Sequence, residues 1–211
     1  MSKTEVLKIN KDFPEKEKIY KAAKIINSGG LVGFPTETVY GIACAYDNVK
    51  GQKRLYKLKK RAITKAFTIH IAHKSMIKAF GCVITKEAKE IIKEYWPGPV
   101  TIILKKKDKK GSIGFRMPSN KIALALIKAA NTGVVAPSAN ISGERSPISA
   151  EDVIAQLEGD IDLLIDGGIT EHRKDSTIVD LTKDKPVILR EGAIKAKEIM
   201  KLIKEQRVKG K

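Results

Sequence analysis

Cysteine, aromatic residues and long apolar runs are scarce in this sequence, and each shortage excludes a class of protein. The 211 residues include two cysteines, Cys44 and Cys82, too few for a disulfide framework or a structural zinc site. No apolar run approaches the roughly 20 residues of a membrane-spanning helix. The first residues carry no apolar segment of the kind found in a secretory signal. We therefore expect a cytoplasmic protein.

Familiar catalytic and nucleotide-binding motifs are also missing. The sequence contains no G-x-x-x-x-G-K-[ST] and no G-x-G-x-x-G. It has no G-x-S-x-G elbow, and no cysteine with an evident histidine partner. His70 and His73 form a close pair, but His70 lies in a predicted strand, where residues three apart face opposite sides. We expect no metal there, and any nucleotide would be bound without a standard phosphate loop.

Acidic residues are outnumbered, with 24 Asp and Glu against 41 Lys and Arg, which gives a net charge of +17. This excess favours an anionic partner such as a nucleotide, a phosphorylated substrate or nucleic acid. The alternative is a generally basic protein whose lysines line solvated helix faces, as in KEAKEIIKEY. The 42% of hydrophobic residues are enough for a folded core, so the chain is not expected to be disordered.

Helical and strand patterns alternate along the chain, which predicts one α/β domain over residues 1–211 with a core at about 12–205. Several late strands are too close together for helical crossovers, so the sheet should be mixed. The predicted helices are 15–28, 49–60, 86–95, 119–130, one capped by Ser149, and 193–205. The predicted strands are 31–34, 67–72, 100–104, 113–117, 134–136, 163–166, 177–181 and 187–190.

Polar residues gather where predicted strands end, which is where open α/β sheets bind ligands. These stretches are FPTETVYG (34–41), KLKKRAITK (57–65), GFRMPSN (114–120), APSANISGERSP (136–147), DSTIVDL (175–181) and ILREG (188–192).

Each of these stretches also has an ordinary structural explanation. The lysines and arginine of KLKKRAITK could meet the last carbonyls of a helix, or clamp phosphate. PSANISG has the composition of a turn, or of a phosphate or ribose site. For Arg116 or Arg190 alone, burial statistics favour a solvent-exposed position, and the alternative is a partner anion.

Three other residues are expected to be structural. We expect His70 to be a hydrogen-bonded core or half-buried histidine, Trp96 to pack beneath a turn, and Cys44 to act as a small buried hydrophobe. The residues alone therefore predict a cleft with basic and hydroxyl groups, suited to a small anionic ligand.

Eight segments in order resemble the threonylcarbamoyl-AMP synthase family, also called YrdC-like or TsaC. The resemblance runs from about residue 29 to residue 194. The segments are GGLVGFPTETVYGIAC, the K-x-R of Lys59 to Arg61, FTIHIA, WPGPVTIIL, GFRMPSN, APSANISGERSP, DSTIVDL and ILREGAI.

This resemblance implies a twisted mixed α/β sheet around a large basic cleft. It implies an enzyme that forms threonylcarbamoyl-adenylate and pyrophosphate from L-threonine, bicarbonate and ATP, with Mg²⁺ on the triphosphate. The product would feed threonylcarbamoyladenosine modification of tRNA through a second enzyme system, with tRNA contact at most secondary.

The resemblance also implies roles for particular residues, with no metal ligand among the side chains. Catalysis is assigned to Lys59, Arg61, Ser138 and Asn140. The ATP site adds Lys65, Ser112, Ser146 and Arg190 to these four. Threonine is assigned to Thr36, His70, Arg116 and Ser176, with Arg116 as the carboxylate partner, while Glu37 has no assigned role beyond stabilising a turn.

The sequence departs from the family pattern in three places. Ala62 and Ala66 replace the usual prolines, and Ser112 replaces a threonine. The chain is also expected to be the short form, without a further C-terminal domain.

Two alternative functions stay open. One is a carbamoyl-adenylate-forming relative, whose usual zinc-finger and acylphosphatase-like modules are not expected in this chain. The other is a non-catalytic module that binds double-stranded RNA or tRNA, although aromatics are only 5% and no stacking platform is evident.

Overall fold

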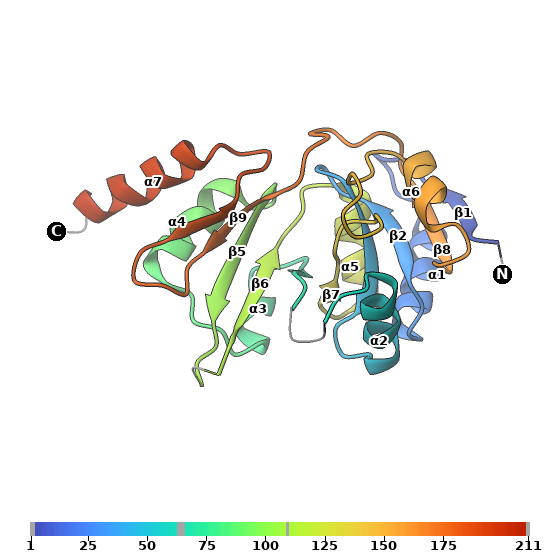
Figure 1. Ribbon diagram of the computed structural model, residues 1–211, viewed down its shortest axis with the longest axis horizontal. Coiled ribbons are helices and arrows are strands. Elements are labelled where there is room, and N and C mark those ends of the chain that lie inside the picture. The colour runs from blue at the N-terminus through green and yellow to red at the C-terminus, as the bar shows by residue number, and fades with distance from the viewer. Residues whose placement is uncertain (1–2, 63–65, 109, 210–211) are drawn as a thin grey trace.

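Within the described residues, ten strands form one mixed sheet that is flanked by helices (Figure 1). The computed structural model describes residues 3–62, 66–108 and 110–209. The strands are β1 (Glu5–Lys8), β2 (Val32–Pro35), β3 (Tyr40–Ala45), β4 (Ile69–His70), β5 (Val100–Lys105), β6 (Ser112–Arg116), β7 (Val134–Val135), β8 (Leu163–Asp166), β9 (Thr177–Asp180) and β10 (Val187–Arg190). The helices are α1 (Lys16–Asn27), α2 (Val49–Leu58), α3 (Met76–Ala79), α4 (Lys86–Tyr95), α5 (Lys121–Ala130), α6 (Ala150–Leu157) and α7 (Ala196–Lys209).

The strand order is β1-β8-β2-β3-β7-β4-β6-β5-β9-β10, and the sheet mixes both strand directions. β1 and β2 pair parallel to β8, β4 parallel to β6, and β5 parallel to β9. The other neighbours are antiparallel, including β5 with β6 and β9 with β10. The predicted mixed sheet is therefore confirmed, and its two halves meet at the two-residue strands β7 and β4.

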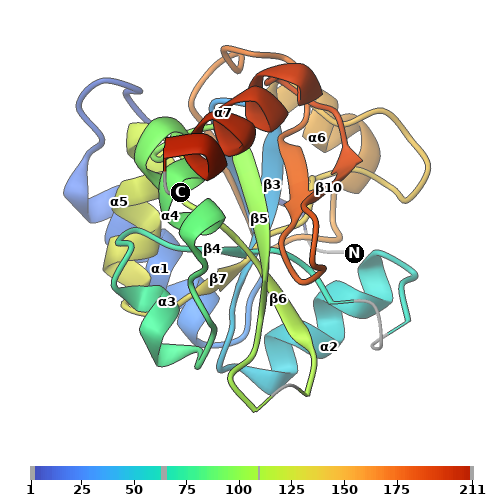
Figure 2. The ribbon, with the colours of Figure 1, turned by 90° about the vertical axis from the view of Figure 1, so that its left-hand side faces the viewer.

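The helices cover the two halves differently (Figures 1 and 2). In the first half, α1 and α5 pack on one face of β2, β3 and β8, while α2 and α6 pack on the other. In the second half, α3, α4 and α7 pack on one face of β5, β6 and β9. The opposite face of this second half provides a wall for the cleft described below. Within the described residues, no helix is long and apolar enough to cross a membrane.

Local sequence signals account for the ends of several helices. The side chain of Ser149 accepts from the backbone of Asp152, whose carboxylate accepts from the backbone of Ser149 in return, so the predicted Ser149 cap of α6 is a complete capping box. Gly29 follows α1 with φ +88°, a conformation that suits glycine at a helix end. Trp96 is buried and donates to the carbonyl of Val100 across the turn between α4 and β5, as predicted. Cys44 is also fully buried, as expected.

Four elements differ from the sequence prediction. β3 was not predicted because all six of its residues are buried, so its sequence shows no alternation of polar and apolar residues. β1 was missed because it is mostly exposed and has only two apolar residues, and α3 because its four residues make a single turn without a helical period. The strand predicted over 67–72 pairs as β4 only at Ile69 and His70, because its neighbour β7 is equally short.

Candidate active site

A cleft of about 880 Å³ lies between the two halves of the sheet. Its walls come from the β2–β3 turn, the start of β3, β4, β5, β6, β9, β10 and the loops after α2, β7 and β8. All the predicted site residues that the structure describes line this cleft, except Ser146. They are Thr36, Lys59, Arg61, His70, Ser112, Arg116, Ser138, Asn140, Ser176 and Arg190. Lys65 lies outside the described residues.

Strand alternation explains how β5 and β6 form both a core and a cleft wall. On β5, Thr101 and Ile103 line the cleft, while Ile102 between them is buried in the core. On β6, Gly114 and Arg116 line the cleft and Phe115 faces the core. Since successive side chains of a strand point to opposite faces, one sequence serves both surfaces.

The ammonium group of Lys59 ties the end of α2 to the turn that follows β7. Its Nζ donates to the carbonyl of Ser138 at 3.0 Å, to the carbonyl of Asn140 at 2.5 Å and to Asn140 Oδ1 at 2.9 Å. An ammonium has three protons, and here each has an acceptor. Burial, with the charge of Arg61 second, lowers the pKa of Lys59 to about 8. Lys59 therefore holds the turn and does not meet the last carbonyls of its own helix.

Asn140 and Ser138 form the other side of this cluster. Ser138 Oγ donates to Asn140 Oδ1 at 2.6 Å, and Asn140 Nδ2 donates to the carbonyl of Glu144 at 2.6 Å. Ser142 Oγ donates to the carbonyl of Lys59 at 2.5 Å. The two segments are thus cross-linked from both sides. Ser142 also lines the cleft, although it was not among the predicted site residues, because nothing in its sequence context distinguishes it from the other serines of the turn.

Arg61 lies beside this cluster and is held against an aromatic ring. Its guanidinium carbon lies 4.7 Å from the centroid of the Phe67 ring, and Nη2 donates to the carbonyl of Ala66 at 3.0 Å. These contacts keep a positive charge at the cleft wall.

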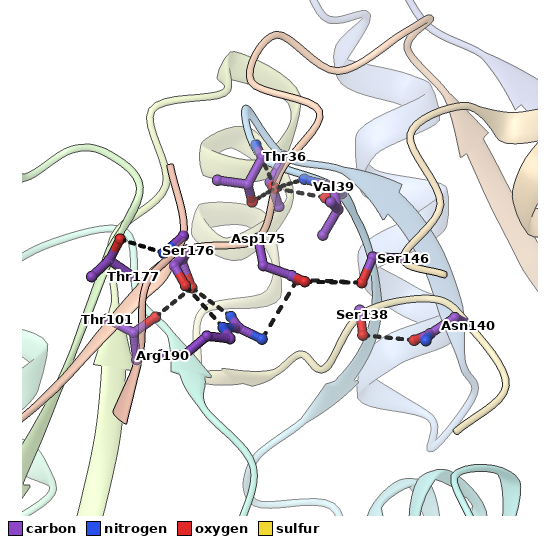
Figure 3. Close-up of polar contacts among 12 residues, drawn as sticks. Thr36, Val39, Thr101, Ser138, Asn140, Ser146, Asp175, Ser176, Thr177 and Arg190 are labelled. Carbon is purple, nitrogen blue, oxygen red and sulfur yellow. Dashed lines mark hydrogen bonds and ion pairs between the residues drawn. The ribbon is translucent and has the colours of Figure 1, made fainter. Parts of the chain in front are cut away.

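Thr36 shapes the β2–β3 turn with its hydroxyl. Thr36 Oγ1 lies 2.7 Å from the carbonyl of Val39 and 2.8 Å from Thr38 Oγ1, and it accepts from the backbone of both residues (Figure 3). A hydroxyl has one proton and two lone pairs, so these contacts within the turn use the full hydrogen-bonding capacity of the Thr36 hydroxyl. The polar residues after β2 therefore form a buried turn in the cleft wall.

Asp175 lies between two predicted nucleotide-site residues (Figure 3). Its carboxylate accepts from Ser146 Oγ at 3.2 Å and lies 3.6 Å from Arg190 Nη1. Ser146 reaches the site through this contact. Asp175 was not among the predicted site residues, because no pattern in the loop before β9 distinguishes it from a surface aspartate.

Ser176 joins β10 to β5. Arg190 donates through Nε to the carbonyl of Ser176 at 3.0 Å and through Nη2 to Ser176 Oγ at 3.1 Å. Thr101 Oγ1 lies 2.9 Å from the same hydroxyl and is buried (Figure 3). Thr101 was also missed, because it is an ordinary β-branched residue of a strand. The side chain of Arg190 is 43% exposed, in line with the expectation from burial statistics.

The expectation of exposure is wrong for Arg116, which is 4% exposed. Its Nη2 lies 2.7 Å from Glu37 Oε1, so the alternative of a partner anion holds. The pair also assigns Glu37 a contact that the sequence did not predict.

His70 is buried next to Arg116, its register partner on the neighbouring parallel strand. Neither ring nitrogen has a hydrogen-bond partner among the described residues, so the expected satisfied histidine is wrong. Burial, and then the charge of Arg116, lower the pKa of His70 well below its usual value, which keeps the ring neutral. A neutral imidazole offers one donor and one acceptor, and both are unpaired here.

The charges around the cleft favour an anion. Among the described lining residues, Lys59, Arg61, Arg116 and Arg190 are basic and Asp175 is acidic. No group of three or more His, Cys, Asp or Glu side chains within the described segments could hold a metal ion.

Comparison with known proteins identifies the family. Residues 24–192 match the family model for Sua5, YciO and YrdC proteins, which is described as telomere recombination. The chain belongs to the Sua5/YciO/YrdC family. A Pyrococcus abyssi protein named threonylcarbamoyl-AMP synthase is 40% identical over 202 residues, which cover 92% of this chain and 59% of that protein.

Solved structures of this family share the fold. The crystal structure of P. abyssi Sua5 complexed with L-threonine has a TM-score of 0.89 and 38% identity, and covers 95% of this chain and 61% of that chain. The crystal structure of Escherichia coli YciO has a TM-score of 0.80 and 29% identity, and covers 90% of this chain and 96% of that chain. This Sua5/YciO/YrdC chain thus spans about three-fifths of its P. abyssi relative and nearly all of YciO.

Proposed function

We propose that this chain forms L-threonylcarbamoyl-AMP and pyrophosphate from L-threonine, bicarbonate and ATP. The observation that carries the proposal is the convergence of basic and hydroxyl side chains from separate segments on one cleft. The P. abyssi relative named threonylcarbamoyl-AMP synthase and the P. abyssi Sua5 structure with bound L-threonine support it.

The proposed chemistry suits a cleft without a protein nucleophile. Threonine and bicarbonate would condense to a carbamate with loss of water. A carbamate oxygen would then attack the α-phosphorus of ATP and displace pyrophosphate. Such a reaction depends mainly on positioning the two substrates and neutralising phosphate charge. Lys59 would act by holding the Ser138–Asn140 turn, while Arg61 and Arg190 would supply charge.

The same reasoning divides the cleft between the two substrates. Lys59, Arg61, Lys65, Ser112, Ser138, Asn140, Ser146 and Arg190 are the proposed ATP site. Thr36, His70, Arg116 and Ser176 are the proposed threonine site, with Thr36 contributing through the turn it shapes. His70 and Arg116 carry most of this assignment, because His70 has two unused nitrogens and Arg116 lies beside it.

Mg²⁺ fits this site as a companion of ATP. Asp175 is the single acidic residue among the described residues that line the cleft, so side chains alone would not enclose the ion. Mg²⁺ commonly keeps several waters and binds through substrate phosphates with one or two carboxylates. The ion would supply charge neutralisation at the triphosphate, and Asp175 would be the carboxylate that the described lining offers it.

We further propose that the product is passed to a threonylcarbamoyl-transfer complex that modifies tRNA. Direct contact between this chain and tRNA would be secondary.

Pyrophosphate release from ATP, measured with and without L-threonine and bicarbonate, tests the proposal. Release that requires both co-substrates is expected. Equal release with serine, or release that requires carbamoyl phosphate, would favour a different adenylate-forming activity. Salt-sensitive tRNA binding without any ATP turnover would favour an RNA-binding module.

A further inference from the structure

Glu37 is a buried carboxylate beside the cleft-lining residues Thr36 and Arg116, and it connects three segments. Its side chain is 2% exposed. Oε1 lies 2.7 Å from Arg116 Nη2, and Oε2 accepts from the backbone of Ser119 at 3.1 Å. The carbonyl of Glu37 accepts from the backbone of His172 at 2.8 Å. The β2–β3 turn, the end of β6 and the loop after β8 therefore meet at one residue.

The stability of the fold does not by itself explain a buried ion pair at this place. Removing two charges from water costs several kcal/mol per ion, and a well-packed apolar pair is often as stable or more so. Glu37 and Arg116 are both almost fully buried, yet Arg116 also lines the cleft. The pair is therefore better explained by what it does to the cleft.

The guanidinium of Arg116 is held from two sides. Nη2 is fixed by Glu37, and Nε lies 3.4 Å from the carbonyl of Gly98. Among the described residues, Nη1 has no hydrogen-bond partner. A guanidinium is planar and rigid, so fixing two nitrogens also fixes where the third can bind. Next to it, both nitrogens of His70 are unused.

We propose that Glu37 is a positioning residue that fixes Arg116 for the carboxylate of the amino-acid substrate. This inference rests on the proposed function. Glu37 touches no substrate in this role and acts through Arg116. It also carries a negative charge that repels the substrate carboxylate, so its positioning effect must outweigh its electrostatic effect.

The electrostatic and positioning effects of Glu37 change the KM for L-threonine in opposite directions, so a variant can separate them. In Glu37→Gln, the site gains one unit of positive charge and keeps an acceptor for the backbone of Ser119. If charge dominated, the KM for L-threonine would fall. If positioning dominates, Arg116 loses its fixed orientation and the KM for L-threonine rises by about tenfold or more, while the KM for ATP stays within about twofold. A purely structural role would lower the melting temperature and leave both KM values unchanged.

The experiment measures threonine-dependent pyrophosphate release and calorimetric L-threonine binding for the full chain, Glu37→Gln and two further variants. Glu17→Gln makes the same charge change on an exposed residue of α1 and should match the wild type. Glu37→Asp keeps the charge but shortens the side chain, so a rise in the threonine KM is expected even if Glu37→Gln fails to fold.

A selective rise in the threonine KM in Glu37→Gln or Glu37→Asp supports the proposal. An unchanged or lower threonine KM in a folded variant overturns it. Absence of threonine-dependent release by the wild type contradicts the proposed function instead, and that result needs no variant.

Discussion

Lys59 Nζ lies 2.9 Å from Asn140 Oδ1, although 81 positions separate the two residues in the sequence. This contact ties the end of α2 to the turn after β7, so Lys59 is a structural part of the cleft lining as well as a charged one. The side chain is buried, and its three acceptors belong to the turn after β7.

Replacing Lys59 with Met should therefore reduce both activity and stability. The substitution leaves buried acceptors at Ser138 and Asn140 without their donor, which costs about 1–3 kcal/mol of unfolding free energy. Urea unfolding and pyrophosphate release would measure the two losses. Lys57→Met, an exposed change on the same helix, is the control. Equal stability of the two variants would contradict a structural role for Lys59.

Arg190→Lys should reduce kcat/KM by about tenfold or more while keeping the charge. Lysine cannot reproduce the paired contacts that Nε and Nη2 make with Ser176. Ser176 would keep its contact with Thr101 but lose its orientation from β10. Steady-state kinetics would measure the loss, with thermal melting as a check on folding. Wild-type kinetics in this variant would contradict a role for the paired contacts between Arg190 and Ser176.

The neutral state of His70 predicts how stability changes with pH. Its pKa in the folded protein lies well below the ordinary value of 6.5, so the unfolded chain binds the proton more readily. Stability should therefore fall as pH drops below about 6.5 and continue to fall towards the folded pKa. His70→Asn should flatten part of this decline between pH 6.5 and 5, whereas His73→Asn, at an exposed position, should not. Thermal melting across this range would measure both, and identical slopes for all three proteins would contradict the prediction.

Gly133, just before β7, and Gly114, on the cleft side of β6, should differ in their tolerance to alanine. A Cβ on Gly133 would lie 2.6 Å from the Phe80 ring and 2.8 Å from Ile69, so Gly133→Ala should cost about 1–3 kcal/mol by overpacking. A Cβ on Gly114 would meet Thr68 Oγ1 at 3.4 Å, an ordinary contact, so Gly114→Ala should cost less than about 1 kcal/mol. Denaturant midpoints compare the two, and a less stable Gly114→Ala would be inconsistent with this packing.

The sequence was informative where one face of an element is polar. Helix α4 shows its apolar side through Ala88, Ile91 and Ile92, and its bounds were predicted correctly. Strand β3 is buried on both faces, so no period revealed it. The central strands β4 and β7 are so short that only their neighbours in the sheet define them.

Site residues could be predicted where they belong to a recognisable motif. Ser138 and Arg190 were predicted from the order of the motifs along the chain, and both line the cleft. Asp175 and Thr101 carry no motif signal, and their importance comes from contacts with residues distant in sequence. The burial of Arg116 could not be deduced either, because it depends on Glu37 arriving from another strand end.

Because the two halves of the sheet meet only at the two-residue strands β7 and β4, a change in their relative position could be followed with dyes. β1 and α7 lie at opposite ends of the molecule, one on each half of the sheet (Figure 1). Both native thiols, Cys44 and Cys82, are buried, so fluorescent dyes would react selectively with cysteines introduced at the exposed positions of Val6 and Lys201. Energy transfer between such dyes would report any change in the distance between the two halves of the sheet when substrates bind.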